Sequence, residues 1–218
     1  MQFRNALDEI LGQRSKVAIL RLLVRTRAEL SGREVARFLS LDHKTCHAAL
    51  RALAEQGVVE ARRLGTAVAY RLRVDHPVTQ DILIPAFEKE QGLIDRYVQD
   101  AIAVSGVVAE SVVLFGSVAR GEEEARSDVD LLLLIRDQKD QEKAEDALDA
   151  TAGTLAAKYG SVPQFIVRDT KTFKAEVLKG DSFFSEVLRT GRVIVGKPLN
   201  EVLKDGRKED RHPKRSSG

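Results

Sequence analysis

The residues best suited to chemistry lie in one stretch, V-V-L-F-G-S-V-A-R-G-E-E-E-A-R-S-D-V-D-L-L-L-L-I, which runs from Val112 to Ile135. An apolar run ends in a Gly-Ser pair (116–117), and after ten intervening residues Asp128 and Asp130 head a second apolar run. Residues two apart on a strand share a face, so we expect both carboxylates to point the same way. Adjacent carboxylates repel each other unless a cation lies between them. The stretch therefore predicts a divalent-metal site beside a phosphate-sized turn.

Composition limits the classes of protein to consider. The chain has 218 residues, 31% of them charged, and a single cysteine, which excludes an internal disulfide and fits a reducing compartment. No apolar run is long enough to cross a bilayer, and the N-terminus does not resemble a signal peptide. Residues 1–76 hold 14 Lys and Arg against 8 Asp and Glu, whereas residues 77–200 hold 15 against 21. We expect a cytoplasmic protein without membrane contact, built from two modules with different partners.

The basic first part has the pattern of three helices and a hairpin. A short leading helix is expected over residues 3–11, followed by a helix capped by Ser15. Ser31 and Glu34 form a capping-box pattern, and Asp42 is expected to cap a third helix that ends near Gln56. From Val58 to Leu72 the apolar spacing changes to alternation, which predicts a hairpin with its tip at Gly65.

The run L-S-G-R-E-V-A-R-F-L-S-L-D-H-K-T-C-H-A-A-L-R-A-L-A-E-Q-G-V-V-E resembles winged helix-turn-helix regulators of bacteria and archaea, and the resemblance covers residues 12–73. It implies transcription regulation through double-stranded DNA, commonly by a homodimer, with one helix in the major groove and the wing against the backbone. The alternative is a scaffold or dimerisation unit, and Cys46 is expected in the core rather than in a metal site with its histidine neighbours. The expected DNA-binding residues are His43, Lys44, Thr45, His47, Arg51, Arg62 and Arg63, with Arg71 as a further wing cation.

The second part alternates between helical and strand patterns. An amphipathic segment over residues 78–104 is interrupted at Pro85 and Gly92. Strands are expected at 112–115, 131–135, 161–167 and 193–195, with helices over 138–158, 170–178 and 181–188. From Leu199 the chain turns polar, which predicts a disordered tail.

A Gly-Ser pair, about ten residues and D-V-D between apolar runs resemble the nucleotidyltransferase superfamily that includes DNA polymerase β, and the longer G-S-V-A-R-G…S-D-V-D-L-L-L resembles its minimal members. The resemblance covers residues 85–197. It implies that Asp128 and Asp130 are catalytic and hold Mg²⁺ or Mn²⁺ for a bound NTP, expected to be ATP. Nucleotide contacts are expected from Gly116, Ser117, Arg120 and Ser127, although Ser117 as a plain helix cap and Arg120 as a surface cation are alternatives.

The sequence departs from this family at one position. The family usually supplies a third carboxylate from the neighbouring strand, but the matching residue here is Gln164. A neutral amide is a poor Mg²⁺ ligand and cannot take a proton from an attacking hydroxyl. Asp169, at the end of the same strand, is an alternative third acid.

The expected fold class is α/β (α+β) in two domains. Residues 1–76 form a winged helix-turn-helix domain, residues 77–198 a linker helix and a nucleotidyltransferase fold with a small mixed sheet flanked by helices, and residues 199–218 a tail. The expected function is a Mg-dependent transfer of a nucleoside monophosphate to a hydroxyl by a DNA-binding protein, with an acceptor protein such as a toxin as one possible partner. The alternative is a transcriptional regulator whose second domain only binds or senses a nucleotide.

Overall fold

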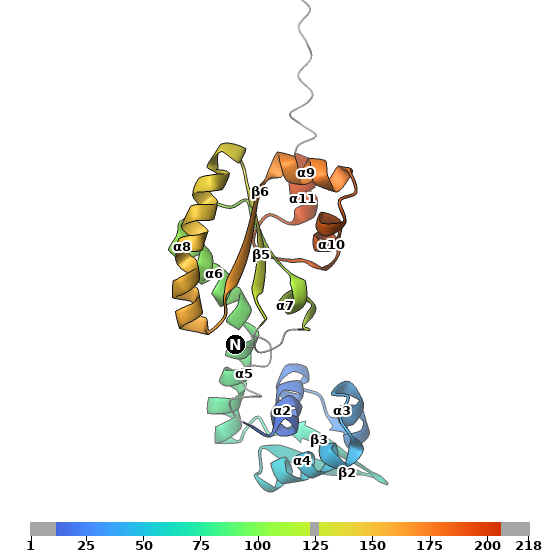
Figure 1. The fold of residues 1–218 in the computed structure, drawn as a ribbon. Helices are drawn as coiled ribbons and strands as arrows, with labels where there is room; N and C mark the ends of the chain where they lie inside the picture. Colours follow the sequence, from blue (N-terminus) through green and yellow to red (C-terminus); the bar gives the residue numbers. More distant parts are fainter. Residues whose placement is uncertain (1–11, 123–126, 206–218) are drawn as a thin grey trace, which may run out of the picture. The chain divides into compact units, whose positions relative to one another are not determined.

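The computed structural model describes residues 12–122 and 127–205, which form two compact units (Figure 1). One unit ends at Leu93 and the other begins at Ile94, and each is described by itself. The helix expected over residues 3–11 and the last part of the expected tail, 206–218, lie outside the described residues.

The first unit has the expected three helices and hairpin. Buried side chains of the first and third helices, such as Leu23 and Leu50, meet in one core because both helices carry apolar residues at helical spacing. The elements of this unit are α2 (Arg14–Thr26), β1 (Leu30–Ser31), α3 (Gly32–Phe38), α4 (His43–Glu55), β2 (Val59–Leu64) and β3 (Ala67–Leu72). The three strands form an antiparallel sheet of order β1-β3-β2.

Most of the helix caps and turns that the sequence predicts for this unit are present in the structure. Ser31 and Glu34 form a capping box, and the Asp42 carboxylate accepts a hydrogen bond from the backbone N–H of Thr45. Gly65 has a positive φ of 62° at the hairpin tip. Two details differ: α2 begins at Arg14 rather than after a Ser15 cap, and the two-residue strand β1 was not expected.

The first unit extends beyond the boundary expected after residue 76. A π-helix, η1 (Thr79–Leu83), leads into α5 (Ile84–Gln91), and Phe87 of α5 lies in the core of the winged-helix unit. The buried guanidinium of Arg21 donates two hydrogen bonds to the Glu90 carboxylate, at 2.7 and 3.0 Å. These contacts place α5 with the first unit rather than with the second.

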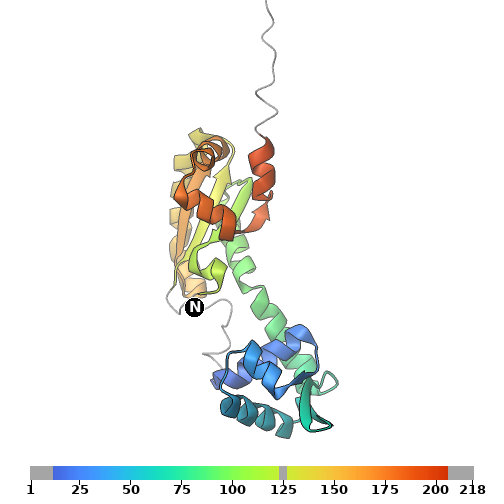
Figure 2. The same ribbon diagram turned by 90° about the vertical axis from the view of Figure 1, so that its right-hand side faces the viewer.

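The second unit is a four-stranded mixed sheet of order β6-β5-β4-β7, in which only β5 and β6 are parallel. In Figure 1, α6 and α8 lie on one side of this sheet and α9, α10 and α11 on the other, and Figure 2 shows the latter three in front of the strands. The elements are α6 (Leu93–Ser105), β4 (Ser111–Phe115), α7 (Gly116–Arg120), β5 (Val129–Ile135), η2 (Gln138–Asp140), α8 (Gln141–Tyr159), β6 (Pro163–Asp169), α9 (Thr170–Leu178), α10 (Ser182–Thr190), β7 (Arg192–Gly196) and α11 (Leu199–Asp205).

The expectation of a disordered tail from residue 199 is wrong for its first seven residues. They form α11, whose Leu199 and Val202 side chains are buried in the same core as Phe173 and Phe184. Leu199 and Val202 are three residues apart, so they lie on the same face of α11. Within residues 12–122 and 127–205, no helix is both long and apolar enough to cross a membrane.

Candidate nucleotide and metal site

The junction of β4 and α7 lies directly against β5. Phe115, the last residue of β4, is the antiparallel partner of Asp130, so the turn after Phe115 faces the Asp130 side chain. Gly116 has a φ of 72°, and a Cβ at this position would overlap the Oδ2 atom of Asp130. Both the backbone conformation and the close approach therefore require glycine. The strand-turn-strand arrangement expected from the sequence is confirmed.

Asp128 and Asp130 form an electrostatically strained pair. Asp128 is exposed and immediately precedes β5, whereas Asp130 is half-buried within it. Burial and the nearby Asp128 carboxylate raise the pKa of Asp130, and Arg120 offsets part of this rise. Two carboxylates whose joint ionisation is disfavoured are suited to holding a cation, which would stabilise both charges.

Gln164 occupies the position at which the nucleotidyltransferase resemblance implies a third carboxylate. In the parallel ladder it lies opposite Asp130, and its side-chain Nε2 donates a hydrogen bond of 2.7 Å to Oδ2 of Asp128. The amide therefore satisfies a carboxylate oxygen of the pair without adding a charge. The sequence-based placement of Gln164 beside the two acids is confirmed.

Asp169 is not a substitute for the missing acid. It lies at the far end of β6, opposite Ile135, about 16 Å of strand from Gln164 at 3.3 Å per residue. Its Oδ1 accepts hydrogen bonds from the backbone N–H groups of Lys171 and Thr172, both at 3.0 Å. Asp169 is thus the N-cap of α9, and the alternative of Asp169 as a metal ligand is wrong.

The other residues expected to contact the nucleotide are Ser117, Arg120 and Ser127. Ser117 lies in the first turn of α7, which has only five residues. Arg120, at the end of α7, is exposed and donates a 2.7 Å hydrogen bond to Glu122. This hydrogen bond raises the pKa of Arg120, and the charges of Glu186 and Asp130 add to the rise. Ser127 accepts a hydrogen bond through its backbone carbonyl. The structure thus brings Gly116, Arg120 and the two acids together.

The donor set fits one hard cation. Carboxylate oxygens are the ligands that Mg²⁺ and Mn²⁺ prefer, and Asp130 gains from neutralisation because its charge is disfavoured. Among the residues that the structure describes, no group of three or more His, Cys, Asp and Glu side chains could hold a metal. The chain would thus supply two acidic ligands, and the remaining ligands of a bound ion would be water or phosphate oxygens.

Sequence reasoning missed Tyr97, a buried residue whose pKa responds to the Asp128 carboxylate. Tyr97 of α6 is fully buried, and its hydroxyl donates to the carbonyl of Ser161 at 3.4 Å. Burial, the Asp128 carboxylate and Tyr159 raise the pKa of Tyr97. The amphipathic spacing of α6 predicted only that Tyr97 faces a core, and no local pattern shows what its hydroxyl meets.

The expected DNA-binding residues are displayed on α4 and the hairpin. On α4, the side chains of His43, Lys44, Thr45 and His47 are exposed, and that of Arg51 lies 3.4 Å from Glu55. Cys46 is buried, which confirms its expected core position. In the hairpin, Arg62 and Arg63 are exposed at successive positions and therefore lie on opposite faces of β2.

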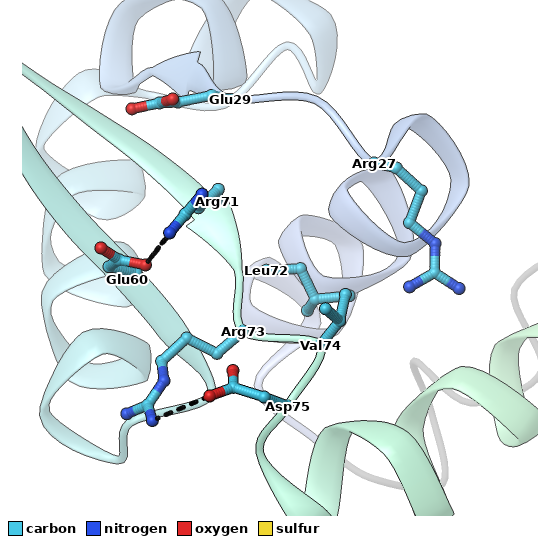
Figure 3. Close-up of a pocket in the computed structure, with 8 residues that line it drawn as sticks. All are labelled: Arg27, Glu29, Glu60, Arg71, Leu72, Arg73, Val74 and Asp75. Carbon is cyan, nitrogen blue, oxygen red and sulfur yellow. Dashed lines mark hydrogen bonds and ion pairs between the residues drawn. The ribbon is translucent and has the colours of Figure 1, made fainter.

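A groove of about 810 Å³ lies at the base of the hairpin (Figure 3). Its three arginines are balanced by three acids, and Arg71 lies 2.7 Å from Glu60 while Arg73 lies 3.6 Å from Asp75. Such mutual pairing leaves little net positive charge for phosphate. Arg71, the further wing cation suggested by the sequence, is thus held in an ion pair. The groove is lined by Arg27, Glu29, Glu60, Arg71, Leu72, Arg73, Val74 and Asp75.

Parts of the chain are similar to solved structures. A homodimeric winged helix-turn-helix DNA-binding domain from Mycobacterium bovis, described as a possible ArsR-family regulator, is 28% identical, covering 43% of this chain and 80% of its own at a TM-score of 0.32. A toxin-antitoxin crystallised with AMP-PNP is 15% identical, and the match covers 54% of this chain and 87% of that chain at a TM-score of 0.34. A mutant of the toxin-antitoxin MntA-HpeT is 13% identical, and the match covers 54% of this chain and 87% of that chain at a TM-score of 0.33. No curated protein matches the chain.

Two families match separate parts of the sequence. Residues 13–60 match the winged helix-turn-helix DNA-binding family, in agreement with the three helices and the start of the hairpin. Residues 102–197 match the family described as polymerase beta, nucleotidyltransferase, and this range includes Gly116, both acids and Gln164. The chain thus joins a DNA-binding winged helix-turn-helix to a nucleotidyltransferase domain of the polymerase beta family.

Proposed function

We propose that the second domain binds a nucleoside triphosphate with Mg²⁺ or Mn²⁺ and transfers a nucleoside monophosphate to a hydroxyl, with release of pyrophosphate. The observation that carries this proposal is the packing of Gly116 against the half-buried Asp130 carboxylate, with Asp128 beside it. A turn that approaches so closely to a paired-acid strand brings phosphate and cation-binding groups together. ATP is the expected nucleotide.

Each site residue has a role in this proposal. Asp128 and Asp130 would hold the cation, which would neutralise phosphate charge and favour the ionised form of an attacking hydroxyl. The Ser117 hydroxyl and backbone N–H would contact phosphate oxygens. Arg120 would bring its positive charge to the phosphates after breaking its ion pair with Glu122, which is exposed to solvent and therefore weak. Ser127 would maintain the backbone beside the acids.

The first domain places this chemistry on DNA. We propose that α4 enters the major groove of double-stranded DNA and that Arg62 and Arg63 of the hairpin contact phosphates. Binding as a homodimer to a two-fold symmetric site, for transcription regulation, belongs to the same proposal. A cytoplasmic location is also proposed, on the basis of one cysteine whose thiol is buried and unpaired.

A second candidate is a regulator whose nucleotidyltransferase domain binds a nucleotide without turnover. The observation in its favour is the hydrogen bond from Gln164 to Asp128. An amide at this position supplies neither a third anionic ligand nor a base for the acceptor hydroxyl. Nucleotide binding alone would then control the DNA-bound state.

Labelled ATP separates the two candidates. Full-length protein would be incubated with Mg²⁺, a cell extract and ATP labelled on its α-phosphate, with Asp128→Ala as the inactive control. Label that moves to a protein, a small molecule or a nucleic-acid end, and does not move with the variant, supports transfer and identifies the acceptor class, including a toxin-like protein. Nucleotide binding without labelled product supports the sensor. Label transfer that persists in Asp128→Ala contradicts the proposed site.

A further inference from the structure

A buried hydrogen-bonded path leads from α6 to the backbone beside Asp128. The Tyr97 hydroxyl donates to the carbonyl of Ser161 at 3.4 Å, and the Ser161 hydroxyl donates to the carbonyl of Ser127 at 3.2 Å. Tyr97 is fully buried and Ser161 is nearly so. Because water has little access to either group, each depends on its protein partner.

The same short segment contacts both sides of Asp128. Ser161 binds Ser127, the residue before Asp128, and the carbonyl of Val162 accepts a 3.1 Å hydrogen bond from the N–H of Val129, the residue after it. The segment continues directly into β6, where Gln164 donates to the Asp128 carboxylate. A shift of residues 161–162 would therefore move the Asp128 backbone and its side-chain partner together.

Helix α6, which carries Tyr97, is fastened at several points within the second unit. One turn after Tyr97, the Asp100 carboxylate accepts hydrogen bonds from Lys158 Nζ and Tyr159 Oη, both at 2.5 Å. The Tyr97 and Tyr159 rings also make an edge-on contact, with centroids 5.0 Å apart. These contacts hold the helix against the C-terminal turn of α8, which leads directly to Ser161.

The hydroxyl of Tyr97 is suited to a permanent donor role. Burial and the Asp128 carboxylate raise the pKa of Tyr97, so the phenol keeps its proton at neutral pH. A phenylalanine would fill nearly the same volume, because the two side chains differ only in the hydroxyl group. Tyr97→Phe therefore removes the hydrogen bond to Ser161 while keeping the packing of the ring.

We propose that Tyr97 is a positioning residue for the cation site: through Ser161 it fixes the backbone on both sides of Asp128. This inference rests on the proposed function, because it presupposes that Asp128 and Asp130 bind a cation. Removing a residue that orients a metal ligand without contacting the metal commonly weakens metal binding 10- to 100-fold. We expect an effect of about tenfold for Tyr97, since its action passes through one intermediate residue.

Calorimetric titration of the full-length chain with Mn²⁺ alone tests the proposal. Tyr97→Phe is expected to weaken Mn²⁺ binding about tenfold, and Ser161→Ala, which removes the next link, by a similar factor. The matched control is Tyr70→Phe, which removes the hydroxyl of another buried tyrosine, in β3 of the first unit, and leaves the Ser161 contact intact. It is expected to bind Mn²⁺ as the wild type does.

A spectroscopic measurement distinguishes positioning from a general loss of stability. Tb³⁺ binds hard oxygen ligands, and its luminescence lifetime after direct excitation shortens as bound water replaces protein oxygens. If Asp128 is displaced in Tyr97→Phe, the lifetime at saturating Tb³⁺ will be shorter than in the wild type and in Tyr70→Phe. Equal Mn²⁺ affinity and equal lifetimes for Tyr97→Phe and the wild type overturn the inference while leaving the cation site intact. Wild-type protein that binds neither ion contradicts the proposed function and this inference together.

Discussion

The ionised Asp130 carboxylate is expected to bind a cation, but without the cation it lowers the free energy of unfolding of the protein. Burial and the Asp128 carboxylate raise its pKa in the folded state. A group with a raised folded pKa stabilises the fold at low pH, and this contribution is lost as the pH rises from the unfolded value of about 3.9 through the folded pKa. At neutral pH the ionised pair therefore lowers the free energy of unfolding, and a bound cation would offset that loss.

Asp130→Asn is accordingly expected to raise the thermal unfolding temperature of the metal-free protein at pH 7. The asparagine cannot hold a cation as well, so Mn²⁺ at 100 times its Kd should stabilise the wild type by about 2.7 kcal/mol and the variant by much less. Scanning calorimetry with and without Mn²⁺ measures both effects. Asp149→Asn, an exposed acid of α8, is the matched control and should change neither quantity. A destabilised Asp130→Asn would contradict the electrostatic account.

Gly116 offers a second test at the same scale. Gly116→Ala is expected to destabilise the second domain and to abolish Mn²⁺ binding, because the new Cβ combines a positive φ with an overlap on the Asp130 carboxylate. Gly160→Ala is a matched control: Gly160 has a φ of 67° but open space around it, so only the backbone strain of about 1–2 kcal/mol remains. Chemical denaturation should show the larger loss for Gly116→Ala. Equal losses with cation binding preserved would contradict the close approach.

At the scale of elements, local sequence signals and the structure agree where one residue type determines a conformation. The capping box of Ser31 and Glu34, the Asp42 cap and the hairpin tip at Gly65 could be predicted, because each depends on a side chain or a φ within a few residues. The strands on each side of Gly116 could be predicted because they are continuous apolar runs between turn residues.

Features that depend on distant partners could not be predicted in the same way. The polar composition after residue 198 hides the burial of Val202, which requires the face formed by α9 and α10. The assignment of α5 to the first unit depends on Glu90 meeting Arg21, 69 residues earlier in the chain. The role of the Tyr97 hydroxyl likewise depends on Ser161, 64 residues away. Periodicity predicts which side of a helix is buried, but not which partner it meets.

The helix α11 leads to a prediction about truncation. Removing residues 199–218 is expected to destabilise the second domain by several kcal/mol, since burial of a leucine or valine side chain contributes about 1.5–3 kcal/mol. Removing only residues 206–218 keeps Leu199 and Val202 in the core and should leave the denaturation midpoint near that of the full chain. Equal midpoints for the two truncations would show that α11 does not stabilise the fold.

At the scale of the whole molecule, residues 1–76 carry a net positive charge and residues 77–200 a net negative charge. Lys44 and Arg62 are exposed on α4 and the hairpin, whereas Arg71 is paired with Glu60. If Lys44 and Arg62 neutralise phosphates, then Lys44→Ala and Arg62→Ala should each weaken binding to genomic DNA fragments. Each should also reduce the slope of log affinity against log salt by about 0.9. Arg71→Ala is the matched control and should change that slope less. Binding that does not respond to salt would contradict the DNA-binding proposal.

The nucleotide site proposed for the full chain depends on a cation held by Asp128 and Asp130. The most direct measurement is calorimetric titration with ATP, in the presence and absence of Mg²⁺, of the wild type and of an Asp128→Ala, Asp130→Ala double variant. We expect the wild type to bind ATP more tightly with Mg²⁺ and the double variant to lose this dependence. ATP binding that is equal in the two proteins, or absent from the wild type with Mg²⁺, would contradict this expectation.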